Sequence, residues 1–142
     1  MFEKGIQFVS AVICGILSYM YGEFDGMLKA LVFCMAIDYI TGLIVAYKNR
    51  ELSSKIGFLG LAKKFVMLLI VALGHIIDVE IFSNAMFMKS AVCGFYIANE
   101  GLSILENTAA VGVKYPEKLL KALKQVNTDE EKEEEDKNEN LS

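Results

Sequence analysis

A long apolar stretch from Ala30 to Tyr47 constrains most strongly what this chain can fold into. It is eighteen residues long. As an α-helix it would extend for roughly 27 Å, close to the hydrocarbon thickness of a bilayer. Asp38 lies near its middle, and Thr41 follows three residues later. A carboxylate at that depth needs a partner on another helix or a water-filled path, so Asp38 is a functional candidate.

Three further apolar segments, at residues 5–22, 65–82 and 87–106, have similar lengths, and 54% of the chain is hydrophobic. Together with residues 30–47 they predict an all-α integral membrane bundle of four transmembrane helices within a domain at residues 1–113. Three crossings are the alternative, in which the segment at 5–22 lies on the membrane surface and the N-terminus is outside.

Charge in the connections predicts the orientation of this bundle. Residues 48–64 carry five basic side chains and one acid, and four lysines follow the last apolar segment between Lys114 and Lys124. Because basic loops stay in the cytoplasm, four crossings place both termini there.

Shorter elements complete the expected architecture. Residues 53–64 predict a short interfacial helix with its lysines in water and its apolar side chains against lipid headgroups. Pro116 suits the first turn of a cytoplasmic amphipathic helix at 114–127. Residues 129–139 hold eight acids and two lysines, so residues 128–142 are predicted to be a disordered acidic tail.

Small and polar residues recur at helical spacing in the apolar segments. Small side chains allow close approach of helix backbones, and the helix-packing candidates are Ala11, Gly15, Ser18, Gly42, Gly94, Ala98 and Gly101. Buried polar side chains act either as contacts between helices or as the lining of a water-filled hole. The candidates for these two roles are Asp38, Thr41, Asn99, Glu100 and Ser103.

His75 and Asp78 are three residues apart and can meet on one helical face. The alternative interpretation is that these two residues lie at a helix end that reaches the outer lipid headgroups. A zinc site has almost no support because His75 is the only histidine, and Cys14, Cys34 and Cys93 fall in separate segments.

No catalytic constellation is visible, so an enzyme, a metal and a cofactor are not expected. The basic residues form no patch with interleaved aromatic residues, and nucleic acid is not an expected partner.

Three short sequence elements occur in an order that indicates a family resemblance. They are DYITG at residues 38–42, SSKIGFLG at 53–60 and IANEGLSILEN at 97–107, followed by a lysine-rich amphipathic end. Over roughly residues 28–126 the chain resembles the bacteriophage holin family, which includes the toxin-secretion holins of clostridia. It departs from the family pattern at GVKYP, residues 112–116, where the family more often has proline directly after the valine.

The resemblance implies a homo-oligomer in the lipid bilayer of the cytoplasmic membrane of a bacterial host, where it opens lesions at a set time. An endolysin, or a toxin, leaves through the lesions as passive cargo, and an antiholin is a further partner to test. Two other functions remain open from the residues: a small ion or proton channel or transporter subunit in which Asp38 and Glu100 bind the ion, and an antiholin-like regulator that opens nothing.

Overall fold

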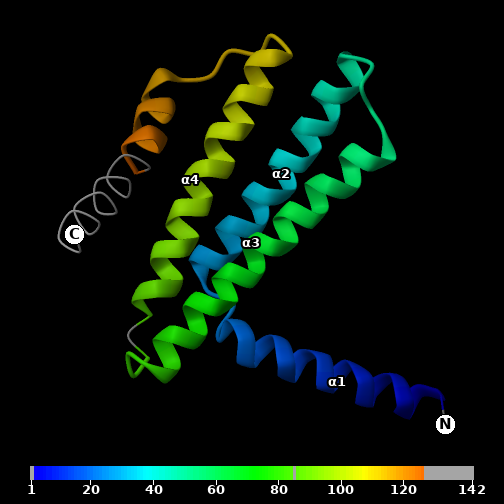
Figure 1. Ribbon diagram of the computed structural model, residues 1–142, viewed down its shortest axis with the longest axis vertical. Coiled ribbons are helices and arrows are strands. Elements are labelled where there is room, and N and C mark those ends of the chain that lie inside the picture. The colour runs from blue at the N-terminus through cyan, green and yellow to red at the C-terminus, as the bar shows by residue number, and fades with distance from the viewer. Residues whose placement is uncertain (1, 85, 127–142) are drawn as a thin grey trace, which may run out of the picture.

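The structure is a computed structural model that describes residues 2–84 and 86–126, and these residues form helices and connections without a strand (Figure 1). The helices are α1 (Phe2–Tyr21), α2 (Gly26–Lys48), α3 (Ser54–Glu80) and α4 (Phe87–Ala110), with further helical turns at 117–126. The expected all-α architecture is therefore confirmed. The tail predicted at residues 128–142 lies outside the described residues.

Helix starts are capped by side chains, because the first backbone N–H groups of a helix have no partner within it. The side chain of Asp25 accepts a hydrogen bond from the N–H of Leu28 at the start of α2 (2.9 Å). Ser53 accepts from the N–H of Ile56 at the start of α3 (3.3 Å). At the start of α4, Met86 has left-handed backbone and provides no side-chain cap, so that helix depends on a cap from another element.

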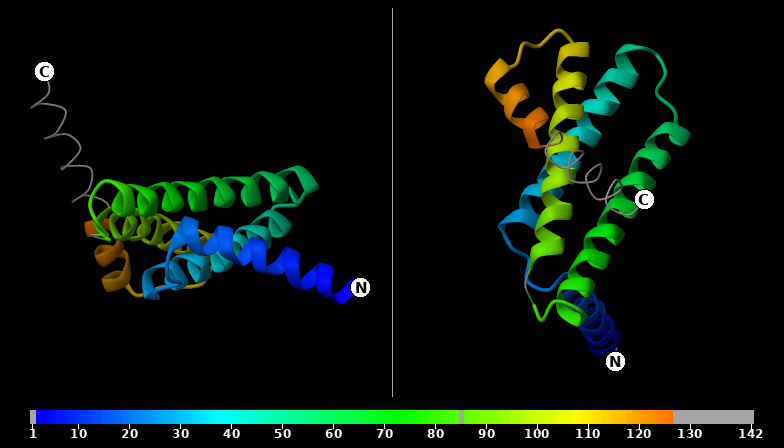
Figure 2. Two further views of the ribbon diagram at one scale, coloured as in Figure 1. Left: turned by 90° about the horizontal axis from the view of Figure 1, so that it is seen from below. Right: turned by 60° about the vertical axis from the view of Figure 1, so that its left-hand side comes forward.

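Helices α2, α3 and α4 form the body of the molecule, in which α2 and α4 lie side by side and α3 runs in the opposite direction (Figures 1 and 2). Apolar side chains from all three helices meet in its core. The buried members of the central cluster are Leu28, Leu31, Met35, Met67, Val71 and Cys93.

Helix α3 is close to α4 at one end of the body and diverges from it towards the other (Figure 2). At the close end, a Cβ atom on Gly74 would lie 3.3 Å from the backbone nitrogen of Lys89, so the absence of a side chain permits the contact. At the divergent end, the first turns of α3 stand apart from the last turns of α4. The body is therefore wedge-shaped, and the wedge opens towards the C-terminal ends of α2 and α4.

Helix α1 leaves the close end of the body at a steep angle (Figure 1). None of its residues is buried, and the element that it contacts most is α3. The structure therefore does not show the expected bundle of four helices packed side by side. Three helices, α1, α2 and α3, are long and apolar enough to cross a membrane by length and composition, within the part of the chain that the structure describes.

Two sequence expectations differ from this arrangement. The separate interfacial helix predicted at residues 53–64 is wrong, because these residues continue without a break into α3. Neither a proline nor a turn sequence interrupts residues 54–80, so one helix can propagate through them. Helix α4, expected to be the fourth crossing, is not among the three apolar candidates; it carries Lys89, Glu100 and Glu106.

Candidate functional site: an ionic cluster between three helices

An ionic cluster joins the three helices of the body near the middle of α2. The ammonium group of Lys64 on α3 donates a hydrogen bond to Oδ2 of Asp38 on α2 (2.7 Å) and another to Oε2 of Glu100 on α4. The three side chains are only 13%, 15% and 8% exposed, in the order Lys64, Asp38, Glu100. Two of the predicted site residues are thus brought together by a lysine from the third helix.

Asn107 extends this cluster along α4. Its side-chain amide donates to Oδ1 of Asp38 (3.2 Å) and to the hydroxyl of Thr41 (3.1 Å). The Thr41 hydroxyl in turn donates to the backbone carbonyl of Ile37, one turn back along α2 (2.9 Å). Both oxygens of Asp38 therefore have donors, which is how a buried carboxylate avoids the cost of lost hydration.

Tyr39 packs against α3 beside this cluster. A Cβ atom on Gly57 would lie 3.3 Å from the Tyr39 hydroxyl, and one on Gly60 would lie 3.4 Å from its ring. The two glycines therefore let the ring of Tyr39 lie directly on the backbone of α3. Tyr39, Gly57 and Gly60 come from two of the elements on which the family resemblance depends, DYITG and SSKIGFLG.

A groove of about 880 Å³ lies in the wedge beside the cluster. Asn99 and Ser103 line it, next to Glu100 and Asp38. Thr41 is partly buried at the contact with Asn107 rather than in the groove. The structure thus places all five predicted lining or assembly residues in or directly beside one polar region, while whether they line a lesion or mediate assembly stays a prediction.

The predicted helix-packing residues divide between the body and α1. In the body, Gly42 faces Asn107, Gly94 faces Met27, and Ala98 is buried. A Cβ atom on Gly101 would lie 2.9 Å from Leu123, in the helical turns at 117–126. On α1, Ala11 and Gly15 are exposed, and Ser18 lies in a small pocket against α3.

A second polar network fixes the close end of the body. The carboxylate of Asp78 on α3 accepts hydrogen bonds from the N–H groups of Met88 and Lys89, each at 2.8 Å, and so caps α4. The ammonium group of Lys89 donates to the carbonyls of Tyr21 and Glu23 and to Asp25, at 2.7, 2.9 and 2.8 Å. Lys89 is fully buried, and its ammonium group is satisfied by these acceptors.

These bonds also set the charge state of Asp25, which lies in the connection before α2. Burial raises the pKa of this carboxyl, but the hydrogen bond from Lys89 and the backbone N–H of Leu28 outweigh that effect and hold the pKa below its ordinary value. Asp25 is consequently the ionic partner of Lys89 and the N-cap of α2 at once.

The pairing of His75 with Asp78 on one helical face is not found. Asp78 faces the start of α4 instead, because unsatisfied N–H groups at a helix start are strong donors. His75 packs against Gly22, and its Nδ1 atom is buried without a hydrogen-bond partner.

Three residues of these networks were not predicted from the sequence as site residues: Lys64, Lys89 and Asn107. Lys64 lies at the boundary of a basic connection, and such a position is typical of a solvated lysine. One signal could have found it: two carboxylates predicted inside apolar helices require a cation, and Lys64 directly precedes an apolar run.

No group of three or more histidine, cysteine, aspartate or glutamate side chains in the described residues could hold a metal ion. Cys14, Cys34 and Cys93 are free thiols at different depths. The chemistry that this arrangement offers is therefore ionic and hydrogen-bonding contact between helices, in which one lysine compensates two carboxylates.

Long apolar helices with large exposed hydrophobic side chains, joined by buried ionic contacts, define a small helical membrane protein. Comparison with known proteins shows the family. The family model described as "Bacteriophage holin family" matches residues 15–128. This chain belongs to the bacteriophage holin family.

The relatives include named and unnamed members. A protein of Bacillus phage phi105 named "Probable holin" is 38% identical over 79% of this chain and 82% of its own length. An uncharacterised protein of Listeria monocytogenes is 46% identical over 73% of this chain and 74% of its own. An uncharacterised 14.9 kDa protein of Clostridium perfringens is 39% identical over 79% of this chain and 85% of its own. No solved structure was found to match the chain.

Proposed function

We propose that this protein is a holin that oligomerises in the bacterial cytoplasmic membrane and opens lesions through which an endolysin leaves the cytoplasm. Family membership and the phage relative named as a probable holin support the class of function. A toxin is the alternative cargo, and in either case the cargo passes without being changed. An antiholin is a further proposed partner.

The ionic cluster of Asp38, Lys64 and Glu100 is the observation that carries the proposal. In one copy these groups satisfy one another and are withdrawn from lipid. They border a groove between helices that diverge. If copies assemble with these faces inward, the same groups would meet water in the lesion, where charged side chains are stable without a partner.

The same cluster favours a holin over an ion-binding channel or transporter. In that alternative, Asp38 and Glu100 would coordinate the transported cation. Lys64 already stands between the two carboxylates, in the place that such a cation would take. The geometry thus favours a structural contact between helices over an ion site.

We further propose that α2, α3 and α4 cross the membrane, over about residues 30–47, 65–82 and 87–106. Helix α4 can cross despite its charges because Lys89 and Glu100 are buried within the body. The steep angle of α1 favours the surface position of segment 5–22 (Figure 1). The end of the body that carries residues 47–63, with their basic side chains, would face the cytoplasm with the C-terminus. The N-terminus would be outside, in place of the cytoplasmic position that four crossings predict.

Inducible expression in a bacterium that also produces a cytoplasmic endolysin tests this function. The parent should depolarise the membrane abruptly, and optical density should fall only when the endolysin is present. Asp38→Asn and Glu100→Gln should change the time of onset, whereas Glu51→Gln, an exposed carboxylate in a connection, should not.

Two results would reject the proposal in favour of its alternatives. A gradual, ion-specific change in potential without lysis would indicate a channel or transporter. Viable cells with an intact potential, together with delayed lysis by a co-expressed holin, would indicate an antiholin-like regulator.

A further inference from the structure

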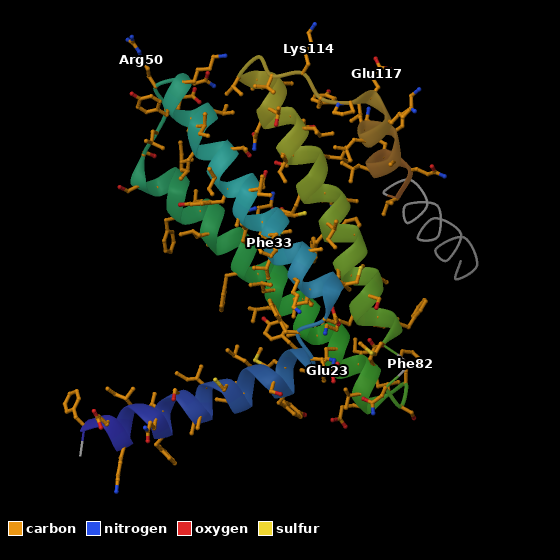
Figure 3. All side chains as sticks on the ribbon, turned by 180° about the vertical axis from the view of Figure 1, so that it is seen from behind. Glu23, Phe33, Arg50, Phe82, Lys114 and Glu117 are labelled. Atoms are coloured by element: carbon orange, nitrogen blue, oxygen red, sulfur yellow. The ribbon has the colours of Figure 1, made fainter. Side chains whose placement is uncertain are left out.

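One end of the body presents basic and large apolar side chains on the same surface. It comprises residues 47–63, which cover the last turn of α2, the connection and the first turns of α3, and Figure 3 marks this end by Arg50. We call it the basic end. Its exposed basic residues are Lys48, Arg50, Lys55 and Lys63, and its only acid is Glu51.

Most of these cations have no partner in the part of the chain that the structure describes. Lys48 donates to the backbone carbonyl of Ala110, which joins the ends of α2 and α4 (2.6 Å). The other three basic side chains make no ion pair with a described residue. Since the first turns of α3 stand apart from α4 (Figure 2), this surface is open.

The opposite end of the body has a different electrostatic character. Its buried lysine, Lys89, is paired with Asp25, and Lys29 lies over the ring of Phe24 (5.9 Å from its centroid). Glu23 and Glu80 are exposed there. An anionic partner would therefore be attracted to the basic end and not to the opposite one.

Apolar side chains at the basic end identify the kind of anionic partner. Tyr47, Phe58 and Leu59 are 75%, 71% and 55% exposed. They adjoin the lysines at the place where the apolar stretches of α2 and α3 begin or end. Side chains of this mixed kind suit the boundary between acyl chains and headgroups, with apolar groups inserted and lysines extended to the phosphates.

We propose that the basic end binds the headgroups of anionic phospholipids, so that the protein gathers such lipids around the connection between α2 and α3. Each lysine or arginine near an anionic membrane surface strengthens the attraction by about fivefold. The inference depends on the chain being a membrane protein and not on lesion formation, so the two can fail separately.

The chain contains no tryptophan, which permits a direct test with a single reporter. Leu59 lies one helical turn from both Lys55 and Lys63, and Leu59→Trp puts the reporter between them. The full-length variant is reconstituted in phosphatidylcholine vesicles that contain either brominated phosphatidylglycerol or an equal amount of brominated phosphatidylcholine. Phe82→Trp, at the opposite end (Figure 3), is the matched control.

Brominated phosphatidylglycerol should quench Leu59→Trp at least twofold more strongly than brominated phosphatidylcholine does. Adding Lys55→Gln and Lys63→Gln, or high salt, should remove the difference, and Phe82→Trp should show none. Equal quenching by the two lipids at Leu59→Trp would overturn the proposal. A preference that emerges only after removal of residues 129–142 would also overturn it, because the acidic tail would then be the occupant in the full chain.

Discussion

The Nζ atom of Lys64 lies 2.7 Å from Oδ2 of Asp38, although 26 residues separate them in the sequence. The same ammonium group reaches Glu100 on α4. Because the first turns of α3 diverge from α4, this lysine is the ionic contact that holds α3 to both neighbouring helices at the wedge.

Loss of the Lys64 charge is predicted to destabilise the body. Lys64→Met leaves two carboxylates close together without their cation, and breaking a buried ion pair in this way costs about 3 kcal/mol. Thermal unfolding in detergent micelles, followed by circular dichroism, would measure the change.

A triple variant separates charge from packing in that experiment. Adding Asp38→Asn and Glu100→Gln to Lys64→Met removes the uncompensated charges, and most of the lost stability should return. If the triple variant is less stable than Lys64→Met alone, the cluster is not held together by charge compensation.

The free energy of unfolding should depend on pH through the ionisation of Asp25. Its folded-state pKa is lowered, so its contribution to the free energy of unfolding is fully present above the ordinary carboxyl pKa and is lost as pH falls through the folded-state value. The difference in stability between the parent and Asp25→Asn should therefore be constant from neutral pH down to about pH 5 and shrink below about pH 4.

Thermal unfolding of the two proteins over a pH series measures this difference. The asparagine side chain of the variant can still accept the Leu28 N–H, so the comparison isolates the ionic contact with Lys89. A difference that grows on acidification would contradict the assignment.

The contact between Gly101 and Leu123 should control how the helical turns at 117–126 lie on α4. A Cβ atom at Gly101 would approach the end of the Leu123 side chain to 2.9 Å, so Gly101→Ala should force this side chain to shift and loosen the contact of these turns with α4. Leu123→Ala in the same chain should restore the contact in part. Limited proteolysis at Lys114 in the connection is the readout, with faster cleavage in the single variant than in the parent. Gly15→Ala, at a glycine with open space around it, is the control and should cleave at the parental rate.

The position of the N-terminus distinguishes three crossings from four. In a chain whose three cysteines are replaced by serine, Lys4→Cys should react in intact cells with a membrane-impermeant maleimide, because α1 is proposed to lie at the outer surface. Lys114→Cys should react only after the membrane is opened. Protection of Lys4→Cys in intact cells would restore the four-crossing topology.

The sequence allowed prediction of the helices and of the polar residues inside them, but not of the partners of these residues. A carboxylate inside an apolar segment is a local pattern, so Asp38 and Glu100 could be found without a structure. Their contact through Lys64 depends on the register of α3 against two other helices, which no local pattern fixes. The same limit applies to Asp78, for which the spacing allowed a pairing with His75: the N–H groups at the start of α4 that it caps belong to another helix.

The angle of α1 was also beyond sequence reasoning. An uncharged segment of this length is compatible with a crossing helix and with a surface helix. Its angle to the body is set at its C-terminal end, where Lys89 donates to the carbonyls of Tyr21 and Glu23. In the sequence, nothing distinguishes Lys89 from other charged residues near the end of an apolar segment.

Release of cargo of graded size from liposomes is the most direct test of lesion formation by this protein. The purified full-length chain is reconstituted in vesicles that contain a small dye and a labelled protein of endolysin size. We expect both to leave the vesicles above a threshold of protein density, and we expect Lys64→Met to alter that threshold while Lys4→Met does not. Release of ions or small dye alone, with the labelled protein retained at every density, would contradict this expectation.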